Sequence, residues 1–196
     1  MNETLCLKQE HKSTQLKIFL LPLNESHIQH LIRLAQEKDL GDLMGWDTFF
    51  EIEDTAGFIT AISEYSLPDS ISSDPIVLGI YLDRDAKPIG YAVLKGLNEQ
   101  LKTAEVGVAV LDRQYRNKGY GRLGLNRILA YAFQELGMTR IWATILPSNH
   151  YSVNMVKKSG FSVKELMPNS WTMPNGELVD MVWMEVTPET WRSVDK

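Results

Sequence analysis

The stretch VAVLDRQYRNKGYGRLGLNRIL, residues 108–129, decides the fold of this chain. It begins with apolar residues typical of a β-strand and ends with apolar residues spaced as on one face of an α-helix. Between them, Gly119, Gly121 and Gly124 spell G-x-G-x-x-G, a pattern associated with dinucleotide binding. The stretch therefore predicts a strand, a glycine-rich turn and a helix that follow one another.

A dinucleotide site makes two further demands that this sequence does not meet. The first glycine must directly follow a strand, and an acidic residue must stand about 20 positions further on, at the tip of the next strand. Here the apolar segment ends near Leu111, and seven residues separate it from Gly119. The next apolar segment, 140–146, is followed by Pro-Ser-Asn-His without a carboxylate. A nicotinamide-dependent enzyme is therefore disfavoured.

The glycine run still favours a loop that binds phosphate. Glycine lets the backbone approach a ligand closely, and the N–H groups at a helix N-terminus attract anions. Arg116, Lys118 and Arg122 add positive charge, although a plain turn with solvated basic residues is the alternative. Gly124 falls inside the predicted helix, where glycine costs about 1 kcal/mol relative to alanine. Its presence predicts close packing of the helix start.

Hydrophobic periodicity extends the pattern to the whole chain. The predicted strands are 15–23, 76–82, 89–97, 103–111, 140–146, 161–167 and 177–186. The predicted helices are 24–41, 53–66, one that contains Gly124 and has apolar positions from Leu125 to Leu136, and 148–160. Gly137 is a natural C-cap, and a turn at 174–176 joins the last two strands. Early hairpins and a later β-α-β crossover predict an α/β (α+β) fold, with a mixed, mostly antiparallel sheet of about six or seven strands and helices on both faces.

Composition indicates a single globular domain. The chain has 196 residues, of which 44% are hydrophobic and 23% charged. We expect a polar leader at 1–15, one domain at 16–186 and a tail at 187–196. The run at 18–23 is far shorter than the roughly 18–20 residues of a membrane span. We therefore expect no membrane association and, without a signal-peptide pattern, a cytoplasmic protein. The net charge of −5 disfavours nucleic acid and tolerates a cationic substrate.

Two motifs resemble one known family. Arg116, Gly119 and Gly121 fill the three defined positions of R/Q-x-x-G-x-G/A, the acetyl-coenzyme A motif of the GNAT superfamily of N-acetyltransferases. The segment NHYSVNMVKKSGF, residues 149–161, resembles the second motif of that superfamily. Asp180 in the last predicted strand and Trp46 in the loop 41–51 resemble the subgroup that acetylates ribosomal-protein N-termini and polyamines. The resemblance covers about residues 16–186 and implies a GNAT-like fold.

The same resemblance implies acetyl-coenzyme A (acetyl-CoA) as co-substrate and no metal. Backbone groups of the strand before the glycine run would pair with the pantetheine arm, and the run itself would surround the pyrophosphate. The implied cofactor residues are Val108, Ala109, Val110, Arg116, Asn117, Lys118, Gly119, Tyr120, Gly121 and Arg122. Asn149 is a further candidate, which either contacts the cofactor or caps its own helix. His27 and His30 share a helical face, but two histidines without further ligands do not predict a metal site.

The expected reaction needs a proton acceptor. A lysine-like amine has a pKa of about 10.4 and is charged at neutral pH, so a base assists its attack on the thioester. Glu105 is the candidate base, since strand alternation places it on one face with Gly107; the alternative is an exposed charge at a strand start. Val156 stands where many family members have a tyrosine that protonates the leaving thiolate. Tyr151, one turn earlier, is the substitute candidate acid, or else an ordinary packing residue.

The acceptor is expected to be a primary amine, namely a peptide N-terminus, a polyamine or another small amine. Trp46, Asp47 and Glu51 are the candidate acceptor residues, because carboxylates and an aromatic ring attract an ammonium group. A catalytically weak or inactive acyl-CoA-binding module is the alternative function, since Val156 replaces the usual acid. Exposed strands, or the hairpin that carries Trp183, could support a homodimer.

Overall fold

The computed structural model describes residues 16–36, 40, 52–63, 75–84, 86–173 and 175–193. Its elements are β1 (Phe19–Pro22), α1 (Glu25–Ala35), α3 (Thr55–Ser63), β2 (Ile76–Tyr81), β3 (Gly90–Asn98), β4 (Thr103–Val110), a short 3-10 turn η2 (Arg113–Tyr115), α4 (Tyr120–Ala130), a π-helical turn η3 (Tyr131–Glu135), β5 (Arg140–Ile145), α5 (His150–Lys158), β6 (Ser162–Thr172) and β7 (Leu178–Val186). Their order agrees with the one predicted from the sequence.

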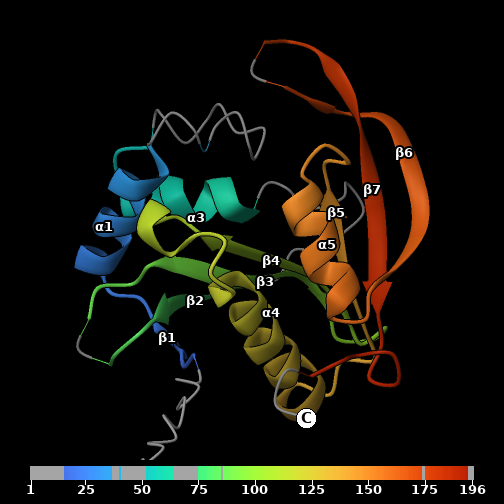
Figure 1. Cartoon of the computed structure of the whole chain (residues 1–196), viewed down its shortest axis with the longest axis horizontal. Coiled ribbons are helices and arrows are strands. Elements are labelled where there is room, and N and C mark those ends of the chain that lie inside the picture. Colours follow the sequence, from blue (N-terminus) through green and yellow to red (C-terminus); the bar gives the residue numbers. More distant parts are fainter. Residues whose placement is uncertain are drawn as a thin grey trace, which may run out of the picture.

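The strands form one seven-stranded sheet in the order β1-β2-β3-β4-β5-β7-β6. Every neighbouring pair is antiparallel except β4 and β5, which are parallel and are joined by α4. Figure 1 shows α1 and α3 on one side of the sheet and α4 on the other. The prediction of a mixed, mostly antiparallel sheet with helices on both faces is confirmed.

Two of the apolar clusters formed by the described residues pack the helices against the sheet. One packs α4 and α5 against the sheet through residues such as Leu129, Val156 and Val106. The other packs α1 and α3 against the opposite face, where Phe58 meets Ala109 and its neighbours. Successive residues of a strand point to opposite faces, so β4 contributes to both clusters. This alternation fixes which side chains of β4 can reach the site described below.

The helix after the glycine run contains Gly124, as the sequence predicts. It begins at Tyr120, directly after Gly119, and its last turn is π-helical. A Cβ at Gly124 would lie 3.0 Å from Ile80 Cδ1, which confirms the close packing predicted for that glycine. Gly137 has a φ of +64° and ends the helical segment, as expected for a left-handed C-cap.

Two predicted boundaries are corrected. The first helix ends at Ala35 with Gln36 as its C-cap residue, whose N–H still bonds to the carbonyl group of Ile32; the predicted end near Gly41 lies outside the described residues. The strand predicted at 161–167 continues to Thr172 as β6, with a register shift between Met167 and Trp171. Within the shift, the N–H of Asn169 donates to the Asp180 carboxylate of β7 at 3.0 Å, which keeps the hairpin paired.

None of the helices in the described part of the chain is long and apolar enough to cross a membrane.

Leu129 offers a test of the packing between α4 and the sheet. Its side chain is fully buried, at 0% exposure, so Leu129→Ala should lower the free energy of unfolding by about 2–5 kcal/mol through lost contacts and a cavity. The control is Leu101, which is 63% exposed in the turn between β3 and β4. Leu101→Ala should change the free energy of unfolding by less than about 0.5 kcal/mol. Urea unfolding followed by circular dichroism measures both. Similar losses in the two variants would contradict this packing.

Candidate active site

The parallel strands β4 and β5 pair over only a short stretch. Their register runs from Thr103 opposite Arg140 to Glu105 opposite Trp142, and both strands continue beyond it without pairing to each other. The other edge of β4 stays paired with β3 as far as Val110. Among the described residues, therefore, no strand pairs with the β5-facing edge of β4 after Glu105.

A cavity of about 150 Å³ lies in this gap. Helices α4 and α5 contribute Leu125, Asn149, Ser152, Met155 and Val156 to its lining, whereas α3, β6 and β7 contribute Ile62, Trp171 and Met181. The strands add Lys95, Glu105, Gly107, Val108 and Thr144 among others. The cavity is thus bounded by elements from both faces of the sheet, and it brings together three of the residues singled out in the sequence: Glu105, Val108 and Asn149.

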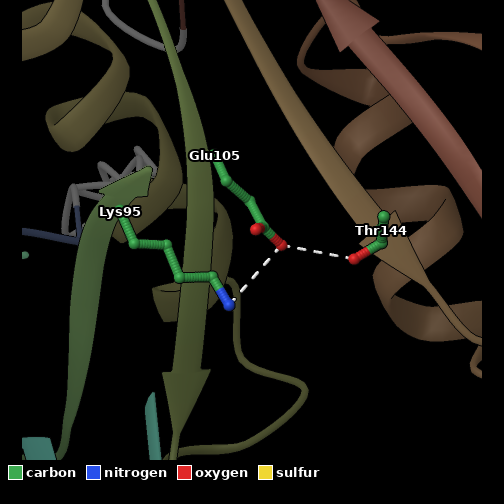
Figure 2. A network of polar contacts seen from close by, with 3 residues as sticks. All are labelled: Lys95, Glu105 and Thr144. Carbon is green, nitrogen blue, oxygen red and sulfur yellow. Dashed lines mark hydrogen bonds and ion pairs between the residues drawn. The ribbon is translucent and has the colours of Figure 1, made fainter. Parts of the chain in front are cut away.

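Glu105 lies at the point where the two strands separate, and it is buried rather than exposed at a strand start. Its side chain is on the face that β4 shares with Gly107 and Ala109, as strand alternation predicts. The Lys95 Nζ atom lies 3.6 Å from Glu105 Oε1, and the Thr144 hydroxyl donates to the same oxygen at 3.2 Å (Figure 2). Glu105 Oε2 is buried and has no hydrogen-bond partner among the described residues.

Burial changes the proton affinities of both charged groups. It raises the pKa of the Glu105 carboxyl to about 7, although the Lys95 ammonium and the Thr144 hydroxyl act in the opposite direction. Burial also lowers the pKa of the Lys95 ammonium, against the attraction of Glu105. A carboxyl whose pKa lies near neutrality can both accept and release a proton under physiological conditions.

The glycine-rich loop meets α4 at the far end of β4. Gly119 is the N-cap residue and has a φ of +92°, a conformation that side chains rarely adopt. It has no side chain to cap the helix, so the first N–H groups of α4 receive no side-chain acceptor from it. A Cβ at Gly121 would lie 3.2 Å from Met155 Sδ of α5, within the space between the two helices. These residues leave an open, positively polarised helix end beside the cavity.

Two of the three basic residues of the loop also bind backbone carbonyl groups. The Arg116 guanidinium donates to the carbonyl oxygens of Val110 and Leu111, and so ties the loop to the end of β4. Arg122 donates to the Lys158 carbonyl oxygen at 3.4 Å, which links α4 to α5. Lys118 is exposed. The arginines therefore shape the loop in addition to supplying charge.

The second motif places one candidate residue in the cavity and another outside it. Asn149 caps α5, since its side-chain oxygen accepts the N–H of Ser152 at 3.1 Å, and it also lines the cavity. Tyr151 is 68% exposed and is not among the lining residues. Val156, at the position of the usual tyrosine, is buried and lines the cavity. The structure thus brings Asn149, but not Tyr151, together with Glu105.

The acceptor candidates Trp46, Asp47 and Glu51 lie outside the described residues. His27 hydrogen-bonds through Nδ1 to the Tyr81 hydroxyl at 2.8 Å. Within the described ranges, no three or more histidine, cysteine, aspartate or glutamate side chains gather as metal ligands would.

Sequence reasoning missed Lys95, Thr144, Trp171 and Met181. Lys95 could have been found, because β3 and β4 form a tight hairpin whose register sets it directly opposite Glu105. The other three come from β5, β6 and β7, and their approach depends on how these strands lie in the sheet.

These features match a known family. The model of the family described as "Acetyltransferase (GNAT) domain" matches residues 17–162. The chain belongs to this family. GNAT acetyltransferases take their acetyl group from acetyl-CoA, so the predicted co-substrate and enzyme class agree with the family.

Individual relatives agree with this membership. The uncharacterized N-acetyltransferase YoaA of Bacillus subtilis is 30% identical over 98 residues, which are 50% of this chain and 54% of that protein. The probable N-acetyltransferase YjcK of the same organism is 26% identical over 152 residues, 74% of this chain and 80% of that protein. The match thus spans about half of YoaA and most of YjcK.

Among solved structures, spermidine N-acetyltransferase from Vibrio cholerae in complex with CoA and spermine superposes with a TM-score of 0.68. The superposition covers 88% of this chain and 96% of that one at 17% sequence identity. At this identity the likeness shows the shared fold.

The titration of Glu105 can be observed directly. Carbon-13 NMR of side-chain carboxyl groups, in protein labelled on glutamate, should show one signal with a midpoint near pH 7, because burial disfavours the charged form. The signal should be absent from Glu105→Gln, which assigns it. A spectrum in which no assigned Glu105 signal titrates near neutrality would contradict this placement of the carboxyl.

Proposed function

We propose that this protein is an N-acetyltransferase that moves the acetyl group of acetyl-CoA to a primary amine by direct attack in a ternary complex. The observation that carries the proposal is the buried Glu105 carboxyl at the point where β4 and β5 separate, beside a cavity that both faces of the sheet line. A donor on the α4 and α5 side and an acceptor on the α3 side can meet in such a gap.

The residues of the glycine loop suit a coenzyme A pyrophosphate. Acetyl-CoA supplies a thioester, whose carbonyl carbon is open to attack by an amine. We assign the pyrophosphate to the open N-terminus of α4 and the loop before it, where backbone N–H groups and the helix dipole favour anions. The unpaired edge of β4 is the proposed partner of the pantetheine arm, and the N–H near Val108 the proposed donor to the thioester oxygen. Asn149 borders the same space.

Glu105 is the proposed base. Removing a proton from an amine of pKa about 10.4 costs about 4–5 kcal/mol at neutral pH, so the attacking form is scarce without assistance. A carboxyl whose pKa is raised to about 7 is closer in pKa to the amine than an ordinary glutamate is, so it accepts the amine proton at a lower free-energy cost. Its unpartnered Oε2 atom is the proposed proton acceptor.

The leaving group needs little help. A thiol has a pKa of about 8.5, so its anion departs readily and takes up a proton near neutral pH. Val156 offers no hydroxyl to the cavity, and the Tyr151 hydroxyl lies on an exposed side chain. We therefore propose that the thiolate leaves without a general acid, because the thiol is itself acidic. Tyr151 remains the one candidate for an acid.

For the acceptor we propose an amine of the polyamine or peptide N-terminus class. The relative from Vibrio cholerae is named for spermidine and was solved with spermine, which supports the polyamine choice. Trp171, Ile62 and Met181 line the acceptor side, and an aromatic ring suits an ammonium group. Asp47 and Glu51 remain the proposed source of negative charge, and Trp46 remains the proposed aromatic contact. A cytoplasmic location and a homodimer remain predictions.

Enzyme activity can be tested by thiol release from acetyl-CoA with a panel of spermidine, spermine and a short peptide with a free N-terminus. Wild-type protein should release thiol with at least one of these amines. Glu105→Gln should lower turnover at pH 7 by about a hundredfold or more, and by less at pH values where the amine is already neutral. Saturable binding of acetyl-CoA without turnover of any amine would favour the acyl-CoA-binding module, and an equal loss at every pH would indicate a structural role for Glu105.

Gly121 tests the cofactor assignment. Gly121→Val should weaken coenzyme A binding sharply, because its side chain would enter the space between α4 and α5 next to Met155. Isothermal titration calorimetry measures the affinity. Gly57→Val is the matched control, since Gly57 also lies in the first turn of a helix, α3, with a similar clearance of 3.2 Å from Asp54 Oδ1. Unchanged affinity in a folded Gly121→Val variant would contradict the assignment.

A further inference from the structure

Lys95 and Glu105 face each other across the β3–β4 hairpin. They are opposite partners in the register, and only 5% of Lys95 and 3% of Glu105 is exposed. Figure 2 shows the lysine side chain crossing in front of β4, so that its nitrogen ends beside the carboxylate. A lysine is rarely buried this deeply unless it has a partner of opposite charge. The placement therefore needs an explanation beyond packing.

The described lining of the cavity carries no other charged side chain. Among the described residues that line the cavity, Lys95 and Glu105 are the only charged ones, and Tyr91 of β3 is the only other titratable one. Helices α3, α4 and α5 contribute uncharged side chains, β5 contributes the Thr144 hydroxyl, and β6 and β7 contribute Trp171 and Met181. In such surroundings a cation 3.6 Å away acts strongly on a carboxylate, because little water screens it.

The two carboxylate oxygens of Glu105 have different surroundings. Oε1 forms an ion pair with the Lys95 ammonium and accepts a hydrogen bond from the Thr144 hydroxyl, and these two contacts fix the rotation of the carboxylate. Oε2 is left without a partner among the described residues. One oxygen is thus anchored, and the other can take up a proton.

We propose that Lys95 is a positioning residue that keeps the buried Glu105 carboxyl ionised and anchors Oε1, so that Oε2 serves as the proton acceptor for the incoming amine. This inference rests on the proposed function, in which Glu105 is the base. Oε2 takes one proton from the substrate ammonium, and the neutral amine forms the nitrogen–carbon bond to the acetyl group as the carbon–sulfur bond breaks. The nitrogen then loses its second proton to the departing thiolate, which gives the amide and the free thiol of coenzyme A. The proton on Oε2 passes to solvent once the product has formed, and the nearby Lys95 charge favours this release because it stabilises the ionised carboxyl.

The first test measures the carboxyl itself. Removing a cation from this distance should raise the midpoint of the Glu105 carbon-13 signal by about 1–3 pH units in Lys95→Met. Lys95→Arg, which keeps the charge, should leave the midpoint near that of the wild type. Thr144→Val, which removes one hydrogen bond and no charge, should raise it less than Lys95→Met does. A midpoint that Lys95→Met leaves unchanged would overturn the inference without any reference to turnover.

The second test connects the charge to the reaction. With the panel amine that the wild type turns over fastest, Lys95→Met should lose about tenfold or more in turnover at pH 7 and recover as the pH rises past the new midpoint. Lys95→Arg should retain the wild-type pH profile. Recovery at high pH separates this effect from misfolding, because an unfolded variant would not regain activity; thermal unfolding and coenzyme A titration provide the controls. A Lys95→Met profile that superposes on the wild-type profile would overturn the inference.

The two proposals can fail separately. If Glu105→Gln loses activity as expected while Lys95→Met keeps the wild-type pH profile, the role of Lys95 is wrong and Glu105 remains the base. If Glu105→Gln keeps full turnover at every pH, or if no panel amine is turned over, Glu105 is not a base for these amines, and the role assigned to Lys95 is overturned with it.

Discussion

The site depends on one constraint, which is that β4 and β5 stop pairing after Glu105 and Trp142. Each strand is held on its outer edge by a different antiparallel partner, β3 for β4 and β7 for β5. The separation leaves a strand edge and a cavity in the middle of an otherwise continuous sheet. Every proposed step of the reaction takes place at this interruption.

Close backbone packing keeps the interruption in place. A Cβ at Gly90 would come within 2.0 Å of the Ala109 carbonyl oxygen, so only glycine allows β3 to approach the end of β4 so closely. Arg116 then binds the carbonyl oxygens of Val110 and Leu111 and connects this end to the glycine loop. The positively polarised start of α4 is therefore fixed relative to the open strand edge. The proposed phosphate and thioester sites therefore lie at a set separation.

The same gap creates an electrostatic problem that Lys95 helps to solve. A carboxyl at the branch point is removed from water, which favours its neutral form and raises its pKa. A base must nevertheless be ionised part of the time. The Lys95 charge on β3 and the Thr144 hydroxyl on β5 offset part of the cost of burial. The pKa of the Glu105 carboxyl therefore stays near 7, and the group is ionised part of the time at neutral pH. The position of the Glu105 carboxyl and its pKa thus both follow from the way β3, β4 and β5 lie next to one another.

The sequence alone determines three features: the order of strands and helices, the glycine loop at a helix start, and the sheet face on which Glu105 lies. Each depends on residues that are near neighbours in the chain, through hydrophobic periodicity, the conformational freedom of glycine and strand alternation. The continuation of β6 through Pro168 and Asn169 was missed, since a contact with Asp180 on another strand maintains it. Tertiary structure alone decided that Glu105 is buried, that Thr144, 39 positions away, binds it, and that Tyr151 stays outside the cavity. Such contacts depend on register and on where two strands stop pairing, which are properties of the assembled sheet and not of any local segment.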